Sequence, residues 1–486
     1  MKAGSADRWG QRDWLLLLPA LALHVWVGLS ALRPIPGDDG IYIASGRLLL
    51  EGVVPYRDYF LAHPPLRTLL AALVLFLTAS PVAVKAVSLT FMAASGILLQ
   101  RAIRHTAPPL VAAAGGTLFL LARTSLDSSG FFIGVDLALF FLVFGVERLA
   151  AGRPLAAGIL HAFSLLAALH AAPAVAACAA VLCIQAGLGR LSGTAVVRAS
   201  GASPGPLPAG RYLLGLLPAP LLFAALAVWP GRCFVDQVIL YHLGKHAAMP
   251  GFGDPMDVVV SFLDRHKALL VLSLTGFLAR KTPLIPLAAS CMVLTLAVTS
   301  SFSSIHDFYY LMTLPFAAWM VAVGLGVLVQ EGVRHGRKSA LLALLPAFLL
   351  LVDLVPALRA GAQLDGGRSR GQALLESLSS TVTEQAPPGP ILGDASLAPW
   401  IALSTGRRLS ASEVDTNPKR FYSGATREEE FLRKIEQDPP AVVVVAPGHG
   451  LGSVPAVREW LRSRYPSRVT LENAAAESKI QVRTAP

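Results

Sequence analysis

The stretch PIPGDDGIYIASGRLLLEGVVPYRDYFLAHPPLR, residues 34–67, lies between two apolar segments and differs in composition from both. It carries two adjacent carboxylates, Asp38 and Asp39, and it ends on a histidine, a double proline and an arginine. Most of the remaining chain is apolar. Because functional residues concentrate on loops held by a rigid scaffold, we predict that the chemistry of this protein is placed here.

The rest of the sequence explains why such a loop is unusual. Of the 486 residues, 54% are hydrophobic and 15% are charged, whereas soluble proteins carry about 25% charged residues. Apolar runs of about 15–20 residues are long enough to cross a hydrocarbon core of about 30 Å. The chain is therefore predicted to be a polytopic membrane protein. Its net charge of +11 fits basic cytoplasmic loops and does not indicate nucleic-acid binding.

The first apolar run sets the predicted orientation. Residues 14–32 follow a basic segment and lack a cleavage site, so we expect an uncleaved helix with a cytoplasmic N-terminus. The run at 66–79 is short for a span and is predicted to lie along the membrane surface. With this choice the basic clusters of the later loops all fall on the cytoplasmic side. The expected location is the inner (plasma) membrane of a bacterium.

The apolar runs and the basic loops together predict about eleven spans: 14–32, 82–100, 108–122, 133–147, 155–170, 173–188, 212–229, 267–280, 283–299, 308–330 and 339–357. The segments left outside the cell are 34–81, 123–132, 230–266, 300–307 and 358–486. We thus predict a mainly α fold, with a transmembrane domain over 1–357 whose first extracytoplasmic loop is 34–81. An extracytoplasmic α/β domain is expected over 358–486.

The C-terminal region shows strands that alternate with helices. GPILGDAS, RRLSAS and PAVVVVAPG each read as a strand, and two late strands follow in SRVTLENA and KIQVRT. LAPWIALSTG, TREEEFLRKIEQ and VPAVREWLRSRY read as helices, the second of them opened by a threonine cap. This alternation predicts a largely parallel sheet.

Two readings are open for the adjacent aspartates. A carboxylate at the exit from the membrane can accept a proton from an incoming hydroxyl as a general base. Aspartate is also a preferred N-cap, and a short amphipathic helix containing Tyr42 is expected next. The residues alone do not separate these two roles.

The end of the stretch gathers cations. Arg57, His63 and Arg67 lie within eleven residues of one another, beside Tyr56 and Asp58. Arginine suits phosphate because its planar fork donates two parallel hydrogen bonds. Tyrosine and arginine also anchor loops at membrane interfaces, which is the competing reading.

The order Asp-Asp-Gly-x-Tyr, Leu-x-x-Gly, PYRDYF and HPPL resembles the first extracytoplasmic loop of the C-type membrane glycosyltransferases. The resemblance is to the protein mannosyltransferase and aminoarabinose transferase branch. It implies inverting transfer of a sugar from a polyprenyl-phosphate donor to a lipid, glycan or protein acceptor at the outer face of the membrane. The family's catalytic aspartate maps onto Asp38, and Asp39 takes the place of its glutamate.

The resemblance also implies which residues hold the donor phosphate. The family's lysine before the double proline maps onto His63, which is only partly charged near neutral pH, so Arg57 or Arg67 is expected to supply the charge. An acid that often precedes that lysine is replaced by Ala62. No cofactor is expected, and no metal site is indicated.

Three later segments are predicted to support this site. Asp136, in SLDSSGFFIGVD, stands where related enzymes place an acid, although a helix cap is the alternative. His306 and Tyr309, in HDFYYLMTLP, are expected to line the site or to belong to the aromatic belt. The basic stretch CFVDQVILYHLGKHAAMPG (233–251) is predicted to hold donor or acceptor, or to attract lipid headgroups.

Two other classes of function compete with glycosyl transfer. A transporter or lipid flippase predicts charges in mid-span and internal repeats, and here the charges lie mainly in loops. A membrane scaffold predicts that the loop at 34–67 is dispensable. No dinucleotide or nucleotide-binding fingerprint is complete in the chain.

Overall fold

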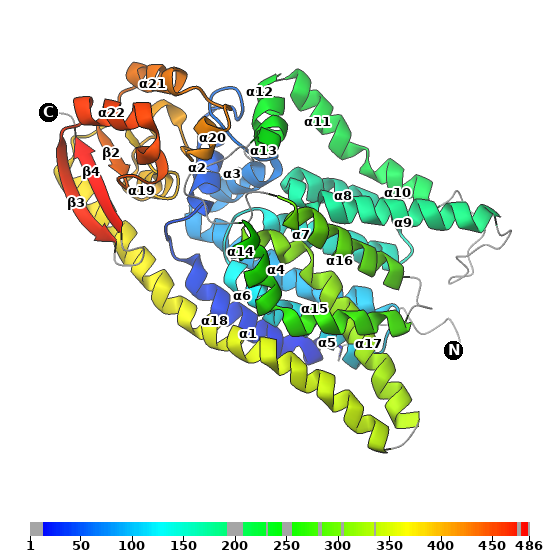
Figure 1. Ribbon diagram of the computed structural model, residues 1–486. Helices are drawn as coiled ribbons and strands as arrows, with labels where there is room; N and C mark the ends of the chain where they lie inside the picture. Colours follow the sequence, from blue (N-terminus) through cyan, green and yellow to red (C-terminus); the bar gives the residue numbers. More distant parts are fainter. Residues whose placement is uncertain are drawn as a thin grey trace.

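The structure is a computed structural model that describes residues 13–191, 208–229, 232–244, 255–279, 284–302, 306–334, 337–473 and 478–484. A helical bundle occupies one side, and a small sheet with its own helices occupies the other (Figure 1). The bundle helices are α1 Leu18–Leu29, α4 Pro81–Arg104, α5 Pro109–Leu121, α6 Arg123–Ser128, α7 Val135–Ala150, α8 Pro154–Ala167, α9 Ala172–Leu191, α10 Pro208–Leu216, α11 Pro218–Val228, α14 Pro255–Arg265, α15 Lys267–Ser273, α16 Ile285–Ser300 and α17 Leu314–Arg334.

The apolar helices make this a multi-pass membrane protein. Five segments are long and apolar enough to cross a bilayer, namely Leu15–Leu32, Pro81–Arg104, Leu169–Leu188, Ala209–Val228 and Leu314–Arg334. Five shorter apolar helices accompany them, and the number of eleven spans remains a prediction. The predicted hinge near 170–173 is confirmed, because α8 ends at Ala167 and α9 begins at Ala172.

The first loop folds into a helical hairpin of α2, Asp39–Leu50, and α3, Leu66–Thr78. A Cβ on Gly46 of α2 would lie 2.7 Å from the backbone nitrogen of Ala72 in α3, so only glycine permits this close approach. The outer face of α3 is apolar and includes Phe76, which is 75% exposed. A helix with one exposed apolar face is suited to the membrane surface, which is the location predicted for residues 66–79.

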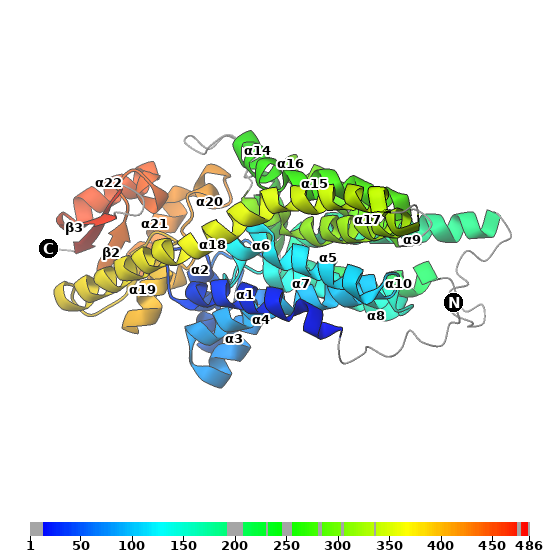
Figure 2. The same cartoon turned by 90° about the horizontal axis from the view of Figure 1, so that it is seen from below.

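A single long helix, α18 Arg337–Gln385, connects the bundle to the sheet. Its length is about 70 Å at 1.5 Å per residue. The buried Arg368 fastens it to α1, because Nη1 donates to the carbonyl oxygen of Val27 at 2.9 Å. The predicted domain border at 357/358 falls inside this helix, so a continuous helix stands where a boundary was expected (Figure 2).

The C-terminal strands are β1 Ile391–Gly393, β2 Val442–Val445, β3 Ser467–Asn473 and β4 Ser478–Thr484, in the order β1-β2-β4-β3. Of the pairings among these described strands, β1 with β2 is parallel, and the other two are antiparallel. The prediction of a largely parallel sheet is therefore wrong. A short connection between β3 and β4 forces an antiparallel hairpin, whereas a parallel pair needs a long crossover.

Two local predictions in this region are also wrong. RRLSAS forms a bridge between Leu409 and Ile391 and then turns as a 3₁₀ helix, because the carboxylate of Asp438 accepts the backbone N–H of Ala411. Thr426 does not cap α21, Glu428–Gln437; its hydroxyl oxygen accepts a hydrogen bond from Arg420 Nε at 2.9 Å. The remaining helices are α19 Ala398–Thr405, α20 Lys419–Tyr422 and α22 Pro455–Arg464.

One hydrophobic core joins the first loop to the sheet. It includes Ile43 of α2, Leu61 of the loop, Leu378 of α18, Ile401 of α19 and Val444 of β2, all essentially buried. The loop and the C-terminal region therefore fold against each other rather than as separate bodies.

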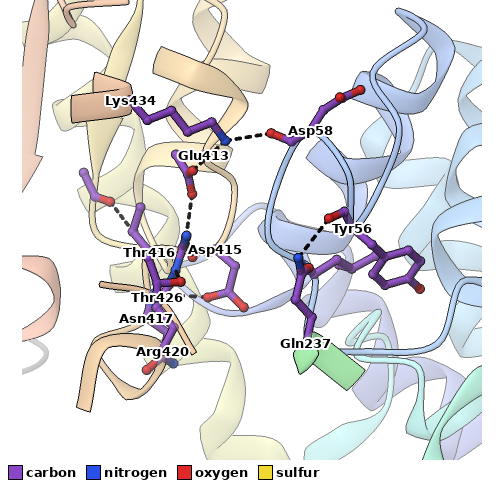
Figure 3. A network of polar contacts seen from close by, with 12 residues as sticks. Tyr56, Asp58, Gln237, Glu413, Asp415, Thr416, Asn417, Arg420, Thr426 and Lys434 are labelled. Carbon is purple, nitrogen blue, oxygen red and sulfur yellow. Dashed lines mark hydrogen bonds and ion pairs between the residues drawn. The ribbon is translucent and has the colours of Figure 1, made fainter. Parts of the chain in front are cut away.

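Polar contacts also join the first loop to the C-terminal region (Figure 3). Lys434 Nζ donates to the backbone oxygen of Asp58 at 2.6 Å and to Glu413 at 2.9 Å. Arg420 pairs with Glu413, and its guanidinium lies 4.6 Å from the ring centre of Phe60. Burial alone would raise the pKa of Glu413, but Arg420 and Lys434 outweigh it and hold that pKa below its usual value.

A further contact brings in α12, Arg232–Val235, the π-helical turn Asp236–Leu240 and α13, Tyr241–Gly244. Gln237 binds the loop from both ends of its amide: Nε2 donates to the oxygen of Tyr56 at 2.9 Å, and Oε1 accepts from the N–H of Leu61 at 2.8 Å. The first loop, the segment around Gln237 and the C-terminal region, which are distant in sequence, therefore contact one another at PYRDYF (55–60).

Replacing Arg420 with methionine leaves Glu413 buried with one cation fewer. We expect a loss of about 3 kcal/mol, since breaking a buried ion pair from one side costs about 3–5 kcal/mol. Thermal unfolding of the purified protein in detergent measures this. The control is Arg433→Met on the exposed face of α21, expected within about 0.5 kcal/mol of wild type; equal melting temperatures for the two variants would contradict the assignment.

Candidate active site

The two aspartates of the first loop have different surroundings. Asp39 is fully buried, and its Oδ2 lies 2.7 Å from the Nζ of the equally buried Lys85 in α4. Its Oδ1 accepts the indole N–H of Trp400 at 3.1 Å. Lys85 donates in addition to the backbone oxygen of Arg33 at 2.9 Å. Asp39 is therefore committed to holding α2, α4 and α19 together.

Asp38 is partly exposed and lines a cavity of about 460 Å³. The facing wall comes from the C-terminal region and includes Ser396, Asn417 and His449. Burial raises the pKa of Asp38; the charge of Lys419 opposes that rise, and the charge of Asp39 adds to it. A carboxylate with a raised pKa beside a cavity is suited to accepting a proton.

Arg67 and two tyrosines, Tyr42 and Tyr309, lie near Asp38. The guanidinium of Arg67 is 4.3 Å from the ring centre of Tyr42, and it donates to the carbonyl oxygens of Ile133 at 2.7 Å and Ala167 at 3.3 Å. Its charge also acts on Asp38. The side chain is 1% exposed, so the predicted phosphate ligand lies in the protein interior.

Tyr309 completes this layer. It belongs to the 3₁₀ helix η6, Asp307–Met312, and its ring stacks on that of His170, with the centres 3.9 Å apart. The ring of His306 stacks on Phe308 and meets Tyr309 edge-on at 5.5 Å. The structure thus brings Tyr42, Arg67 and Tyr309 together near Asp38.

Arg57 and Asp58 lie away from this layer. The Arg57 side chain is 54% exposed, and it pairs with Asp58 through Nε and Nη2, both at 2.8 Å. The backbone N–H of Val54 also binds Asp58, at 2.8 Å. The hydrogen bond from Arg57 lowers the pKa of Asp58. This pair closes a turn, and the predicted phosphate role of Arg57 remains a prediction.

His63 is held between rings. Its ring centre is 5.5 Å from Tyr42 and 5.3 Å from His242 of α13. Tyr56, which has a positive φ of 69°, donates its hydroxyl to the backbone oxygen of His63 at 2.7 Å. His63 is thereby placed beside Tyr42 and near the layer that includes Arg67. Lys245 and His246 of the predicted basic stretch lie outside the described residues.

Solved structures that this architecture resembles include membrane glycosyltransferases. The chain superimposes on ArnT, an aminoarabinose transferase, from Cupriavidus metallidurans with a TM-score of 0.61 over 97% of both chains, at 14% identity. The chain has the fold of the C-type glycosyltransferases. ArnT bound to undecaprenyl phosphate gives a TM-score of 0.59 at 13% identity and covers 98% of each chain.

A second C-type enzyme gives the same result. The archaeal oligosaccharyltransferase AglB from Archaeoglobus fulgidus, in complex with an inhibitory peptide and a dolichol-phosphate, has a TM-score of 0.53 at 11% identity. The alignment covers 90% of this chain and 70% of AglB. No family model matches the chain, and no curated protein matches its sequence.

Within this C-type fold, sequence reasoning missed Lys419 and Asp415. Burial lowers the pKa of Lys419, and the charges of Asp38 and Asp415 oppose that change. Burial raises the pKa of Asp415 to about 6. Both residues belong to DTNPKR (415–420), where Asn-Pro marked a loop but nothing in the sequence indicated that the loop reaches Asp38.

Lys85 was also missed, although the sequence carried a signal for it. It is a lysine inside the predicted span 82–100, and an ionisable residue within a span is a functional candidate by default. Asp136 is 1% exposed at the start of α7, and its carboxylate interacts with the charge of Arg67. Its supporting role in the site remains a prediction.

Among the described residues, no group of three or more histidines, cysteines or acids is placed to hold a metal ion. The four cysteines are free. The described cavity at Asp38 is lined by two carboxylates, Asp38 and Asp394, and by the imidazole of His449.

The Asp39–Lys85 pair leads to a double-mutant prediction. Asp39→Asn or Lys85→Met alone leaves the other charge buried without its partner. We expect each substitution to lower the free energy of unfolding by about 3–5 kcal/mol. The double variant removes both charges and is expected to recover a large part of that loss. Thermal unfolding in detergent of all four proteins completes the cycle; additive losses in the double variant would disprove the pairing.

Proposed function

We propose that this protein is a glycosyltransferase that moves a sugar, with inversion, from a polyprenyl-phosphate donor to an acceptor on a lipid, a glycan or a protein. The observation that carries the proposal is that the two adjacent aspartates have different surroundings. Asp39 is held by its ion pair with Lys85, whereas Asp38 lines a cavity and its pKa is raised by burial. The ligands of ArnT and AglB, undecaprenyl phosphate and dolichol-phosphate, support the class of donor.

The proposed reaction is a single displacement at the anomeric carbon of the sugar. The acceptor oxygen attacks the anomeric carbon while the bond from that carbon to the phosphate oxygen breaks. The proton of the acceptor passes to Asp38, and the electron pair leaves with the polyprenyl phosphate. Because a phosphate leaves as a stable anion, the enzyme needs a base and positive charge rather than a strong acid.

We assign the positive charge to Arg67 and Lys419. Both act electrostatically on Asp38, and they come from different parts of the chain, one from α3 and one from α20. His63, beside Tyr42, is the remaining candidate among the predicted phosphate ligands. Asp39 is reassigned from base to positioning residue. The site is proposed to face the outside of the inner membrane, with the N-terminus in the cytoplasm.

Asp38→Asn tests the proposed function directly. Losing a general base is expected to reduce transfer by about 10²–10⁴-fold while the melting temperature stays near that of wild type. The readout is consumption of polyprenyl-phosphate sugar in membranes that contain the variant. Asp58→Asn, which alters the exposed pair with Arg57, is the matched control and should keep most of its activity. Full transfer by the Asp38 variant would overturn the proposal.

The pH profile gives a second test. Asp38 must be ionised to accept a proton, so the rate should fall as pH falls through its pKa, and burial places this fall above the usual range for aspartate. Lys419→Met removes a charge that lowers this pKa, so the acidic limb should move to higher pH. The rate at high pH should fall as well, because Lys419 is also assigned to the leaving phosphate. Arg427→Met, on the exposed surface, should leave the profile unchanged. An unmoved limb in the Lys419 variant would contradict its assigned place beside Asp38.

A further inference from the structure

The C-terminal sheet holds a second cavity, of about 370 Å³, between α22, the carboxyl end of β2 and the strands β3 and β4. Four arginines line it: Arg458, Arg462, Arg468 and Arg483. No carboxylate is among its described lining residues. We infer that this arginine pocket is an anion-binding site for a phosphate or diphosphate group, separate from the cavity at Asp38.

The first support is the placement of like charges on α22. Arg458 and Arg462 are four residues apart and share one face of the helix, an arrangement that costs a few tenths of a kcal/mol in an isolated helix. A single carboxylate, Glu459, lies 3.7 Å from Arg462, and both side chains of that pair are largely exposed. Such an exposed contact contributes little, so it leaves the positive charge of this face largely in place.

The second support comes from the sheet. The register of β3 and β4 sets Arg468 directly opposite Arg483, and like charges directly opposite each other destabilise a sheet. Burial lowers the pKa of Arg483, and the charges of Arg468 and Arg462 add to that effect. The helix α22 and the strand pair β3–β4 thus each place like charges at one cavity. A bound anion would offset the repulsion between these charges.

The arrangement of Arg483 fits a ligand site. Its Nε and Nη2 donate to Gln481 at 2.9 and 2.6 Å, and Nη1 contacts the carbonyl oxygens of Leu461 and Tyr465 at 3.3 Å. These contacts fix its guanidinium at the base of the pocket. Arg458, Arg462 and Arg468 are exposed around it. One held cation with three exposed cations beside it suits a tetrahedral anion, to which arginine donates paired hydrogen bonds.

The loop after β2 separates the two cavities. Pro447, Gly448 and Gly452 line the arginine pocket, whereas His449 and Gly450 line the cavity at Asp38. In Figure 1, α22, β3 and β4 lie at the end of the molecule away from the helical bundle. This placement favours a phosphate that arrives from solution over a headgroup of the bilayer that holds the bundle.

Calorimetric titration of the full-length protein with inorganic pyrophosphate tests the inference. The protein is held in phosphatidylcholine bilayers, and the titration is repeated with phosphatidylglycerol included. Unchanged affinity identifies a soluble phosphate as the source, and weakened affinity identifies competition by an anionic lipid headgroup. Both interpretations require that pyrophosphate binds in the arginine pocket, and substitution of the pocket arginines tests this.

Arg462→Ala combined with Arg468→Ala is expected to weaken pyrophosphate binding about tenfold or more, since each removes hydrogen bonds to a charged group. Arg427→Ala with Arg433→Ala, two exposed arginines of the α21 region, is the matched control and should bind as wild type. Without pyrophosphate, the pocket variant should melt no lower than wild type, because repulsion is relieved. Equal binding by all three proteins, or equal loss in the control, would overturn the site.

Discussion

The buried ion pair between Asp39 and Lys85 is the interaction on which the rest of the arrangement depends. Removing two charges from water is costly, and the cost is offset only when the partners are well oriented and further hydrogen bonds satisfy them. Trp400 and the backbone oxygen of Arg33 provide those bonds. The pair therefore fixes the start of α2, and with it the direction in which the neighbouring Asp38 faces.

This constraint explains why two adjacent aspartates differ in role. In a helix, neighbouring residues point about 100° apart. Once Asp39 is turned into the core, Asp38 has to face the cavity at the edge of the sheet. The C-terminal region then supplies Lys419, whose neighbours Asn417 and Pro418 line the cavity, and contacts of Arg420 and Lys434 hold this region in place. The proposed site is thus formed jointly by the two ends of the chain.

The sequence predicted one half of this arrangement. The apolar runs located most bundle helices, and the charged loop drew attention to Asp38, Tyr42 and Arg67, which the structure places near one another. Asp39 was not separated from Asp38, because capping and catalysis favour the same residue type. Lys419 and the antiparallel pairings of the sheet were missed, since both depend on which distant segments meet, and local pattern does not specify that.

The long helix α18 links the packing of the helical bundle to that of the C-terminal sheet. Each residue in a helix advances the chain by about 1.5 Å and rotates it by about 100°. An insertion of one residue between Arg368, which is fastened to α1, and Leu378, which belongs to the core of the sheet, would turn those two contact faces out of register. The number of residues between these two contacts therefore sets how the bundle and the sheet are oriented relative to each other.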